Sequence, residues 1–260
     1  MGRVTPSTDP ELVDFAAQII REAGALTLQM FKAAELAVER KGDGTPVTVA
    51  DRQAERYLRE RIRERFPDDE ILGEEEPDQA GTSGRRWVID PIDGTESFAR
   101  GVALYTNLLY LEDEHGPAVG VINVPAIDEM VVAGRGLGCT FNGVPCHVND
   151  HATLERSMLS TSGFDWWEPD LLAAARRSAM GLRTWGDGYG YLLVATGRIE
   201  AMVDPSIKFW DVAPCQVIIS EAGGRWSALD GSADAQQGSF VATNGILHDD
   251  VLALLADTVA

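Results

Sequence analysis

Apolar side chains recur every three or four residues near the start of the chain, a spacing typical of a helix with one buried face. The apolar positions are Leu12, Phe15, Ala16, Ile19, Ile20, Ala23, Leu26 and Met30. Asp9 precedes them as a capping residue, and Pro10 suits the first helical position. The pattern predicts a helix that begins at about Asp9, ends near Ala34 and buries its apolar stripe in the core.

A second helix is expected after a loop rich in glycine and proline at residues 41–46. It runs from about Ala50 to Phe66, and its charged side chains predict an exposed face held by ion pairs. These side chains are Arg52, Glu55, Arg56, Arg59, Glu60, Arg61, Arg63 and Glu64. Asp51, at the beginning of this helix, is a candidate helix cap.

Short apolar runs predict several strands in the middle of the chain. Trp87-Val88-Ile89 opens a buried strand, which we expect to break at Pro91 because proline cannot donate to a strand ladder. Asn142-Gly143 is a hairpin signal. The further strands expected in this half are 104–111, 118–124, 129–133 and 138–141.

Helices and strands alternate in the second half, which favours an open mixed sheet covered by helices. The expected strands are 158–162, 182–185, 201–203 and 240–244, and the expected helices are 168–180, 191–196, 212–222 and 248–256. We therefore predict an α/β fold with layered α+β character. An N-terminal α+β subdomain would span residues 1–150, and a C-terminal α/β subdomain would span residues 151–260.

Composition narrows the class of function. The chain has 260 residues, of which 45% are hydrophobic, so it can bury a sizeable core. Its 41 acidic and 22 basic residues give a formal net charge of −19. So acidic a chain argues against nucleic acid as the main ligand, because phosphate backbones are bound by Lys and Arg. It is compatible with binding metal cations.

Cysteine content and apolar patterning indicate a cytoplasmic protein. The three cysteines, Cys139, Cys146 and Cys215, are odd in number and lack CxxC spacing, so we expect no disulfide framework and a reducing compartment. Residues 1–9 have no apolar segment typical of a signal peptide. No stretch approaches the ~20 apolar residues that span a bilayer, so no membrane partner is expected.

Candidate chemistry centres on Asp90-Pro91-Ile92-Asp93-Gly94-Thr95. Two carboxylates and the carbonyl of Ile92 are oxygen ligands of the kind that a hard cation prefers. Gly94-Thr95 opens a helix, and the unpaired amides at a helix start attract anions. A strand end capped by aspartates has the same pattern, so this stretch alone leaves both interpretations open.

Two other stretches complete a resemblance. Besides the Asp90–Thr95 stretch, the motifs are Gly73-Glu74-Glu75 and Trp210-Asp211-Val212-Ala213, the latter followed by Glu221-Ala222-Gly223-Gly224. With these motifs the chain resembles the inositol monophosphatase family of Mg²⁺-dependent phosphatases. The resemblance extends from about residue 10 to about residue 255. It implies the inositol monophosphatase-like sugar-phosphatase fold, Li⁺ sensitivity and a homodimer. One departure is Ser97, where the family usually has Asn; this position lies outside the metal ligands.

The resemblance assigns metal ligands, namely the side chains of Glu74, Asp90, Asp93 and Asp211 and the carbonyl of Ile92. Four acids brought together would repel one another without a cation. We therefore expect two or three Mg²⁺ ions per subunit, since two metals can clamp the attacking and leaving oxygens of a phosphate ester.

The resemblance also assigns catalytic roles. Thr48-Val49-Ala50-Asp51 matches the segment whose aspartate, with a threonine, polarises the attacking water. Asp51, Thr95 and Glu74 are therefore the expected catalytic residues. The amides of Gly94 and Thr95 would hold the phosphate. Glu75 would contact the metal ligands and orient them without binding the ion itself.

The substrate is specified less closely than the chemistry. Trp185-Gly186-Asp187-Gly188-Tyr189 resembles the histidinol-phosphate phosphatases of the family, and so does 242–248. Histidinol phosphate, a precursor in histidine biosynthesis, carries an ammonium group and an imidazole ring. Asp187 and Asp204 could pair with these groups, and Trp185 or Tyr189 could stack on the ring. The alternative is a structural turn at Asp187 with both aromatic rings in the core.

The candidate substrate residues are Gly94, Thr95, Trp185, Asp187, Gly188, Tyr189 and Asp204. We rank histidinol phosphate ahead of inositol phosphate, because inositol offers hydroxyl groups alone to these acids. A docking or regulatory protein on the same fold and an acidic metal buffer are the competing classes. Asp51 and Thr95 beside the ligands favour the phosphatase, since neither alternative needs them.

Overall fold

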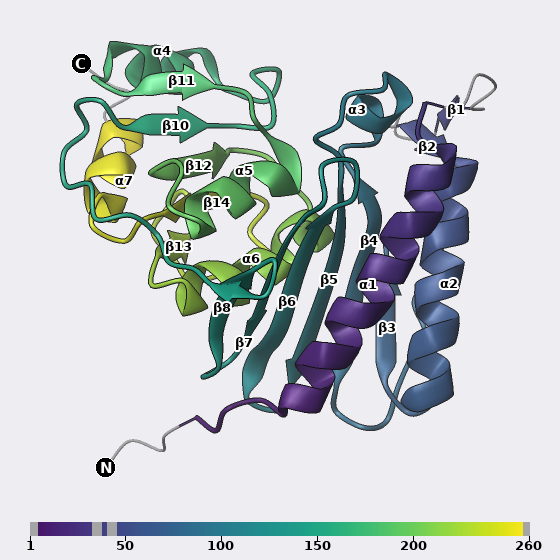
Figure 1. Ribbon diagram of the computed structural model, residues 1–260. Helices are drawn as coiled ribbons and strands as arrows, with labels where there is room; N and C mark the ends of the chain where they lie inside the picture. The colour runs from purple at the N-terminus through teal and green to yellow at the C-terminus, as the bar shows by residue number, and fades with distance from the viewer. Residues whose placement is uncertain (1–4, 33–37, 41–45, 257–260) are drawn as a thin grey trace.

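The computed structural model describes residues 5–32, 38–40 and 46–256. Of the expected loop at 41–46, residues 41–45 lie outside these residues. The first helix ends at Met30, where Phe31 turns to an extended backbone, so the expected end near Ala34 is too late. Figure 1 shows the arrangement of the following elements. In chain order they are α1 (Pro10–Met30), β1 (Val38–Arg40), β2 (Pro46–Thr48), α2 (Val49–Arg65), β3 (Glu70–Gly73), β4 (Arg86–Asp93), α3 (Thr95–Ala99), β5 (Thr106–Asp113), β6 (Gly116–Val124), β7 (Glu129–Gly134), β8 (Gly138–Phe141), β9 (Val144–Pro145), β10 (Met158–Ser160), α4 (Pro169–Arg177), β11 (Gly181–Arg183), α5 (Asp187–Ala195), β12 (Ala201–Asp204), α6 (Phe209–Glu221), β13 (Arg225–Ser227), β14 (Phe240–Thr243) and α7 (His248–Ala256).

Two sheets organise these elements. The larger has seven strands in the order β3-β4-β5-β6-β7-β8-β9, and the smaller has five in the order β11-β10-β12-β14-β13. In the larger sheet β3 runs parallel to β4, and each later neighbour is antiparallel. The short strands β1 and β2 pair separately. None of the helices in the described part of the chain has the length and apolar character to cross a membrane.

Helices cover and separate the sheets in alternating layers (Figure 1). α1 and α2 lie on one face of the larger sheet, where Ile19, Leu58 and Trp87 share a core. α5 and α6 pack between the two sheets, and α4 and α7 cover the outer face of the smaller sheet. Since α5 and α6 are held from both sides, the residues in their first turns are fixed between the sheets.

The layered α/β fold expected from the sequence is confirmed, with most element boundaries shifted by a few residues. The strands β1, β2, β3, β9 and β13 were not expected; each has two to four residues, too few to show a clear alternation by themselves. The division into subdomains at residue 150 stays a prediction. α6, from the expected second subdomain, packs on β5, β6 and β7 of the first, so the two parts share a core.

The expected strand break at Pro91 is wrong. β4 continues through Pro91 to Asp93. Asp90 pairs with Leu108 and Asp93 with Thr106, so β4 gains one residue relative to β5 between these points. Such a bulge leaves a position without a ladder hydrogen bond, which a proline can occupy. The Pro91 carbonyl is still satisfied, because Asn107 Nδ2 donates to it at 2.6 Å.

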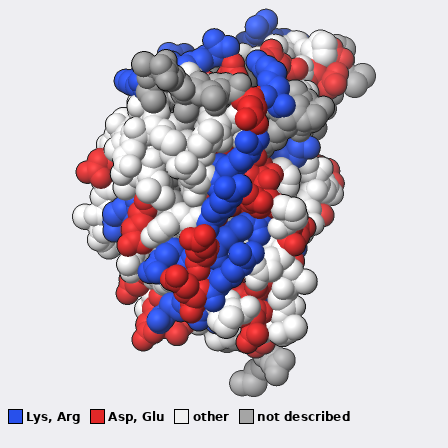
Figure 2. Space-filling view, turned by 90° about the vertical axis from the view of Figure 1, so that its right-hand side faces the viewer, with Lys and Arg blue, Asp and Glu red and all other residues white. Residues whose placement is uncertain are grey.

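The expectation that every charged residue of α2 is exposed is also wrong. Glu55 and Arg59 are 0% and 4% exposed, because this edge of the helix faces β4 and the turn after β3. The rest of the helix agrees with the expectation. Figure 2 shows basic and acidic side chains interspersed on this side of the molecule, and exposed pairs such as Arg61–Glu64 lie at 2.6 Å.

His248, the first residue of α7, is fully buried. Its Nδ1 lies 3.0 Å from Thr243 Oγ1, and its Nε2 lies 2.9 Å from Ser227 Oγ. A neutral ring therefore satisfies both hydroxyl groups. The pKa of His248 is lowered to about 4, mainly by burial and also by the charge of Arg225, while Asp249 opposes the shift.

This buried histidine predicts a loss of stability in acid. The unfolded chain takes up the His248 proton near pH 6.5, whereas the folded protein takes it up near pH 4. The free energy of unfolding should therefore fall as pH drops through this window, by about 3 kcal/mol from this residue. Urea denaturation at pH 7.5 and pH 4.5 should show a smaller pH effect in His248→Gln than in the wild type. Equal pH effects in both proteins would show that His248 is not the cause.

Candidate active site

Three aspartates from two elements converge between the sheets. Asp90 and Asp93 lie on β4 and Asp211 lies in the first turn of α6, and one carboxylate oxygen of each lies within 4.8 Å of the others. In a regular strand, residues three apart point to opposite faces. The bulge at Pro91 reverses this alternation, so Asp90 and Asp93 share one side.

The first turn of α6 fixes the third carboxylate. The Lys208 backbone N–H donates to Asp211 Oδ2 at 3.1 Å, as in a capping box. This helix begins at Phe209, three residues before the expected start, and carries Pro214 inside it. The expected start at Val212 is too late because Asp211 does not precede the helix; it lies inside the first turn, which its side chain caps.

The aspartate cluster is electrostatically unfavourable by itself. Burial raises the pKa of Asp90 and of Asp211 well above the usual range, and the charges of nearby acids raise both further. Burial also raises the pKa of Asp93 to about 7, although hydrogen bonds from Gly188 N–H and Thr106 Oγ1 oppose the shift. Buried carboxylate oxygens in mutual repulsion fit the ligand set of a hard divalent cation.

Glu74 joins the cluster from the end of β3. Its side chain hydrogen-bonds Asp90, and its charge raises the pKa values of Asp90, Asp93 and Asp211. Its backbone N–H donates to Ile89 O at 3.2 Å, which continues the pairing of β3 with β4. The structure therefore brings together the four acids that the sequence assigned to metal binding.

Asp51 and Thr95 meet beside the cluster, as expected. Thr95 Oγ1 lies 3.3 Å from Asp51 Oδ1 and 3.0 Å from Ile92 O. Asp51 Oδ2 accepts the Thr48 N–H at 2.8 Å in the capping box of α2. Asp51 therefore caps α2 through Oδ2 and meets Thr95 through Oδ1, and its catalytic role stays a prediction. Burial raises the pKa of Asp51, and its bonds to Thr48 oppose the shift.

Asp187 lies directly against Gly94. Gly94 has a φ of 77°, and a Cβ there would lie 2.6 Å from Asp187 Oδ2. Asp187 itself has a φ of 55°, and its N–H donates to Ser162 Oγ at 2.9 Å. Burial raises the pKa of Asp187 well above the usual range, and Asp93 and Asp204 add to the shift. The carboxylate therefore borders the turn that carries Gly94.

Gly188 acts on the cluster through Asp93. Its N–H donates to Asp93 Oδ2 at 2.5 Å, and Thr106 Oγ1 donates to the same oxygen at 2.8 Å. A Cβ on Gly188 would lie 2.5 Å from Thr106 Oγ1. Glycine at this position lets the first turn of α5 approach β5 closely enough to orient Asp93.

Asp204 has its acceptor sites occupied. Oδ1 accepts from Thr161 Oγ1 at 3.1 Å and from Ser162 N at 2.8 Å. Oδ2 accepts from Ser162 Oγ at 2.9 Å and from Tyr191 OH at 2.7 Å. Since a carboxylate offers about four lone-pair sites, this arrangement suits a residue that holds the Ser162 loop in place.

Asp93 and Asp211 of the cluster border a cavity of about 180 Å³ together with Asp187 and Asp204. It is lined by Asp93, Ser162, Gly163, Trp166, Asp187, Asp204, Pro205, Ser206, Ile207 and Asp211. Of the expected aromatic contacts, neither Trp185 nor Tyr189 lines it. The Arg183 guanidinium lies 5.7 Å from the Trp185 ring centroid. Tyr189 packs against the central core and hydrogen-bonds Arg198.

Trp166, by contrast, lines the cavity and is 71% exposed. Sequence reasoning missed it. The available signal was a pair of tryptophans in a loop after Gly163, where one ring can pack inward and the other can face outward.

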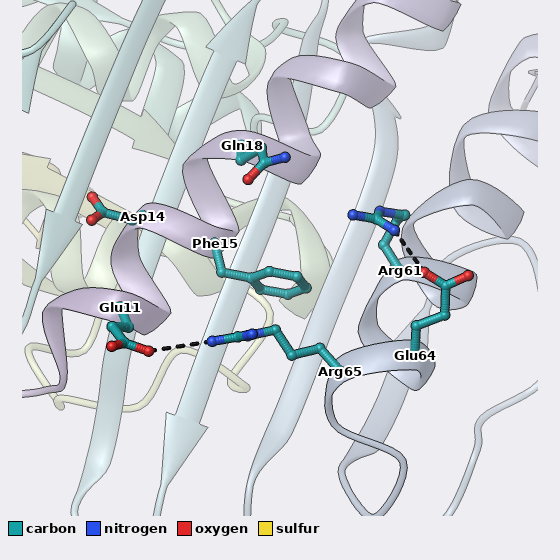
Figure 3. A pocket seen from close by; sticks show the side chains of 7 residues that line it. All are labelled: Glu11, Asp14, Phe15, Gln18, Arg61, Glu64 and Arg65. Carbon is teal, nitrogen blue, oxygen red and sulfur yellow. Dashed lines mark hydrogen bonds and ion pairs between the residues drawn. The ribbon is translucent and has the colours of Figure 1, made fainter.

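A larger groove of about 520 Å³ lies between α1 and α2, on the far side of the larger sheet (Figure 3). Two ion pairs line it, Arg65 with Glu11 at 3.3 Å and Arg61 with Glu64 at 2.6 Å. Among the described residues, the acids whose oxygens converge are those of the aspartate cluster. We therefore place the active site at the smaller cavity.

A buried ion pair holds the turn that carries Glu74. Glu55 accepts the Glu75 N–H at 2.8 Å, the Glu76 N–H at 3.1 Å and Arg59 Nε at 2.7 Å. Arg59 Nη2 also donates to Glu76 O at 2.9 Å. Glu75 is thus tied in through its backbone, and the expected role of its carboxylate stays a prediction.

Comparison with known proteins gives a consistent result. A model described as Inositol monophosphatase family matches residues 9–260. The chain is 38% identical to a histidinol-phosphatase from Mycobacterium tuberculosis, over 92% of this chain and 96% of that protein. It is 39% identical to a histidinol-phosphatase from Chlorobaculum parvum, over 95% and 97%. Among solved structures it resembles a Thermotoga maritima IMPase, with a TM-score of 0.88 and 30% identity over 95% and 98% of the chains.

Removing one carboxylate of the cluster should ease folding without metal and weaken metal binding. We expect Asp93→Asn to be more stable than the wild type in EDTA by about 1–3 kcal/mol, because one repelling charge is gone. Mg²⁺ should raise the melting temperature of the wild type and raise that of the variant much less. If Mg²⁺ raises the melting temperature of Asp93→Asn as much as that of the wild type, Asp93 is not a metal ligand.

The Glu55–Arg59 pair should matter to metal binding although neither residue is among the expected ligands. Glu55→Gln places an amide N–H₂ where backbone N–H groups need an acceptor, so we expect a loss of about 3 kcal/mol in stability. We also expect a several-fold weaker Mg²⁺ affinity by titration calorimetry. Glu64→Gln, which breaks an exposed pair on the same helix, is the matched control and should change neither quantity. Wild-type affinity in a folded Glu55→Gln would show that the pair does not position Glu74.

Proposed function

The chain belongs to the inositol monophosphatase family, and from this membership we propose that it hydrolyses histidinol phosphate to histidinol with Mg²⁺. As a member that matches named phosphatases along most of its length, it is a phosphoric monoester hydrolase. One observation carries the choice of substrate: the Asp187 carboxylate lies against Gly94, beside the aspartate cluster.

The metal ligands we propose are Glu74, Asp90, Asp93 and Asp211, with the carbonyl of Ile92, for two or three Mg²⁺ ions. The buried, mutually repelling oxygens fit such a cation. When bound, Mg²⁺ neutralises charge on the phosphate and makes a bound water more acidic.

Asp51 and Thr95 are the residues we propose for handling the water. Thr95 Oγ1 lies where it can hold the water against Asp51 Oδ1, which accepts its proton. A raised pKa makes the Asp51 carboxylate a better base than an exposed one. The amides of Gly94 and Thr95, at the start of α3, would hold the phosphate oxygens.

Asp187 is the residue we propose for recognising the substrate cation. In histidinol phosphate the ammonium group is on the carbon next to the ester CH₂, so it stays close to the bound phosphate. An acid in contact with Gly94 is placed to pair with it. Asp204 would act by holding the Ser162 loop and by its charge, since its acceptor sites are occupied.

Hydrolysis of inositol 1-phosphate is the second candidate. Asp187 can also accept a hydrogen bond from a hydroxyl, and the structure resembles an IMPase. A docking or regulatory role on the same fold is the non-enzymatic alternative. We further propose, on the family resemblance, a cytoplasmic homodimer that Li⁺ inhibits.

Substitution of Asp187 separates these substrates. We expect Asp187→Asn to raise KM for histidinol phosphate roughly ten- to a hundredfold, because the ammonium group loses its partner. Turnover of glycerol 2-phosphate should change little, because it carries no cation. Asp165→Asn removes an exposed charge from the nearby loop and serves as the control.

Two results would contradict this role. If Asp187→Asn lowers kcat/KM equally for histidinol phosphate and glycerol 2-phosphate, Asp187 has a structural role. An unchanged KM for histidinol phosphate, with inositol 1-phosphate the better substrate, would favour the second candidate.

A further inference from the structure

The loop that follows β10 is anchored on both sides of Trp166. Before it, Thr161 and Ser162 donate to Asp204. After it, Trp167 Nε1 donates to Thr161 Oγ1 at 2.9 Å. The Phe164 and Trp167 rings meet edge to face at 6.1 Å, inside the same loop. The backbone around Trp166 is therefore held in place although the residue belongs to no helix or strand.

The two adjacent tryptophans are used differently. Trp167 is 6% exposed, and its indole is bonded and packed. Trp166 is 71% exposed and lines the cavity of the aspartate cluster. In the part of the chain that the structure describes, ring and cation contacts are found for Trp167 and Trp185 and not for Trp166. A large aromatic surface at a cavity gains free energy when a ligand covers it.

We infer that Trp166 is the specificity residue that stacks on the imidazole ring of the substrate. This inference rests on the proposed function. The phosphate would be held at Gly94 and the ammonium group at Asp187, which contacts Gly94 and lines the cavity. The ring lies farther along the substrate from the phosphate, and Trp166 is the exposed aromatic side chain that borders the same cavity.

The chemistry of the ring matches this residue. An imidazole is flat and becomes a cation when protonated, and indole is the best aromatic partner for a cation. The surrounding acids Asp187 and Asp204 favour the protonated ring. Trp185 is a poorer partner because the Arg183 guanidinium already lies over its ring. Inositol has no flat ring, so Trp166 would favour histidinol phosphate over inositol phosphate.

Three variants test the inference: Trp166→Ala, Trp166→Phe and Trp185→Ala. For Trp166→Ala we expect a KM for histidinol phosphate raised roughly five- to thirtyfold, with kcat changed less than about twofold. Trp166→Phe should recover most of the loss, since phenyl keeps an aromatic face. Trp185→Ala should raise KM less than Trp166→Ala. Glycerol 2-phosphate, which has no ring, should show the wild-type KM in Trp166→Ala.

Binding of histidinol, measured by calorimetry, adds a readout that does not depend on turnover. Its affinity should fall by a factor similar to the change in KM. An unchanged KM and affinity in Trp166→Ala would overturn the inference, and so would equal losses on glycerol 2-phosphate. A larger effect from Trp185→Ala would assign the ring to Trp185 instead. A wild-type enzyme that does not prefer histidinol phosphate would overturn the proposed function itself.

Discussion

Repulsion among buried carboxylates is the constraint on which the rest of this structure depends. Asp90, Asp93 and Asp211 present oxygens within 4.8 Å of one another, with Glu74 bonded to Asp90. Such a group is tolerable when a cation neutralises it and costly otherwise. The surrounding features serve to hold it: the β4 bulge aligns two acids, the first turn of α6 fixes a third, and the Glu55–Arg59 pair holds the turn with Glu74.

The helices between the sheets couple this cluster to the residues that we propose for substrate recognition. The first two residues of α5 perform separate tasks, because Gly188 bonds Asp93 while Asp187 lies against Gly94. Ser162 links these parts, since its hydroxyl accepts from the Asp187 N–H and donates to Asp204. Asp204 in turn anchors the loop that carries Trp166. The adjacent residues Asp187 and Gly188 therefore connect the aspartate cluster, through their hydrogen bonds, to the loop that carries Trp166.

Local signals were enough to predict much of this. The apolar spacing of α1 and the Asn142-Gly143 hairpin act within a few residues, and the structure contains both elements. The family resemblance assigned the motif acids, and the structure brings Asp90, Asp93 and Asp211 together. The misses depend on contacts between distant segments. Pro91 stays within its strand because β5 accommodates a bulge, and Glu55 is buried because the turn after β3 covers it. The Trp166-Trp167 pair signals one outward-facing ring, but whether that ring or Trp185 lines the cavity depends on how the distant segments pack.

The most direct measurement is a phosphate-release assay on histidinol phosphate, myo-inositol 1-phosphate, fructose 1,6-bisphosphate and phosphoadenosine phosphate, each with Mg²⁺ and with EDTA. The account predicts release that requires Mg²⁺, with the highest kcat/KM for histidinol phosphate. Full activity in EDTA would contradict the role of the carboxylate cluster. A Mg²⁺-dependent enzyme with its highest kcat/KM for one of the other three esters would contradict the account of Asp187 and Trp166.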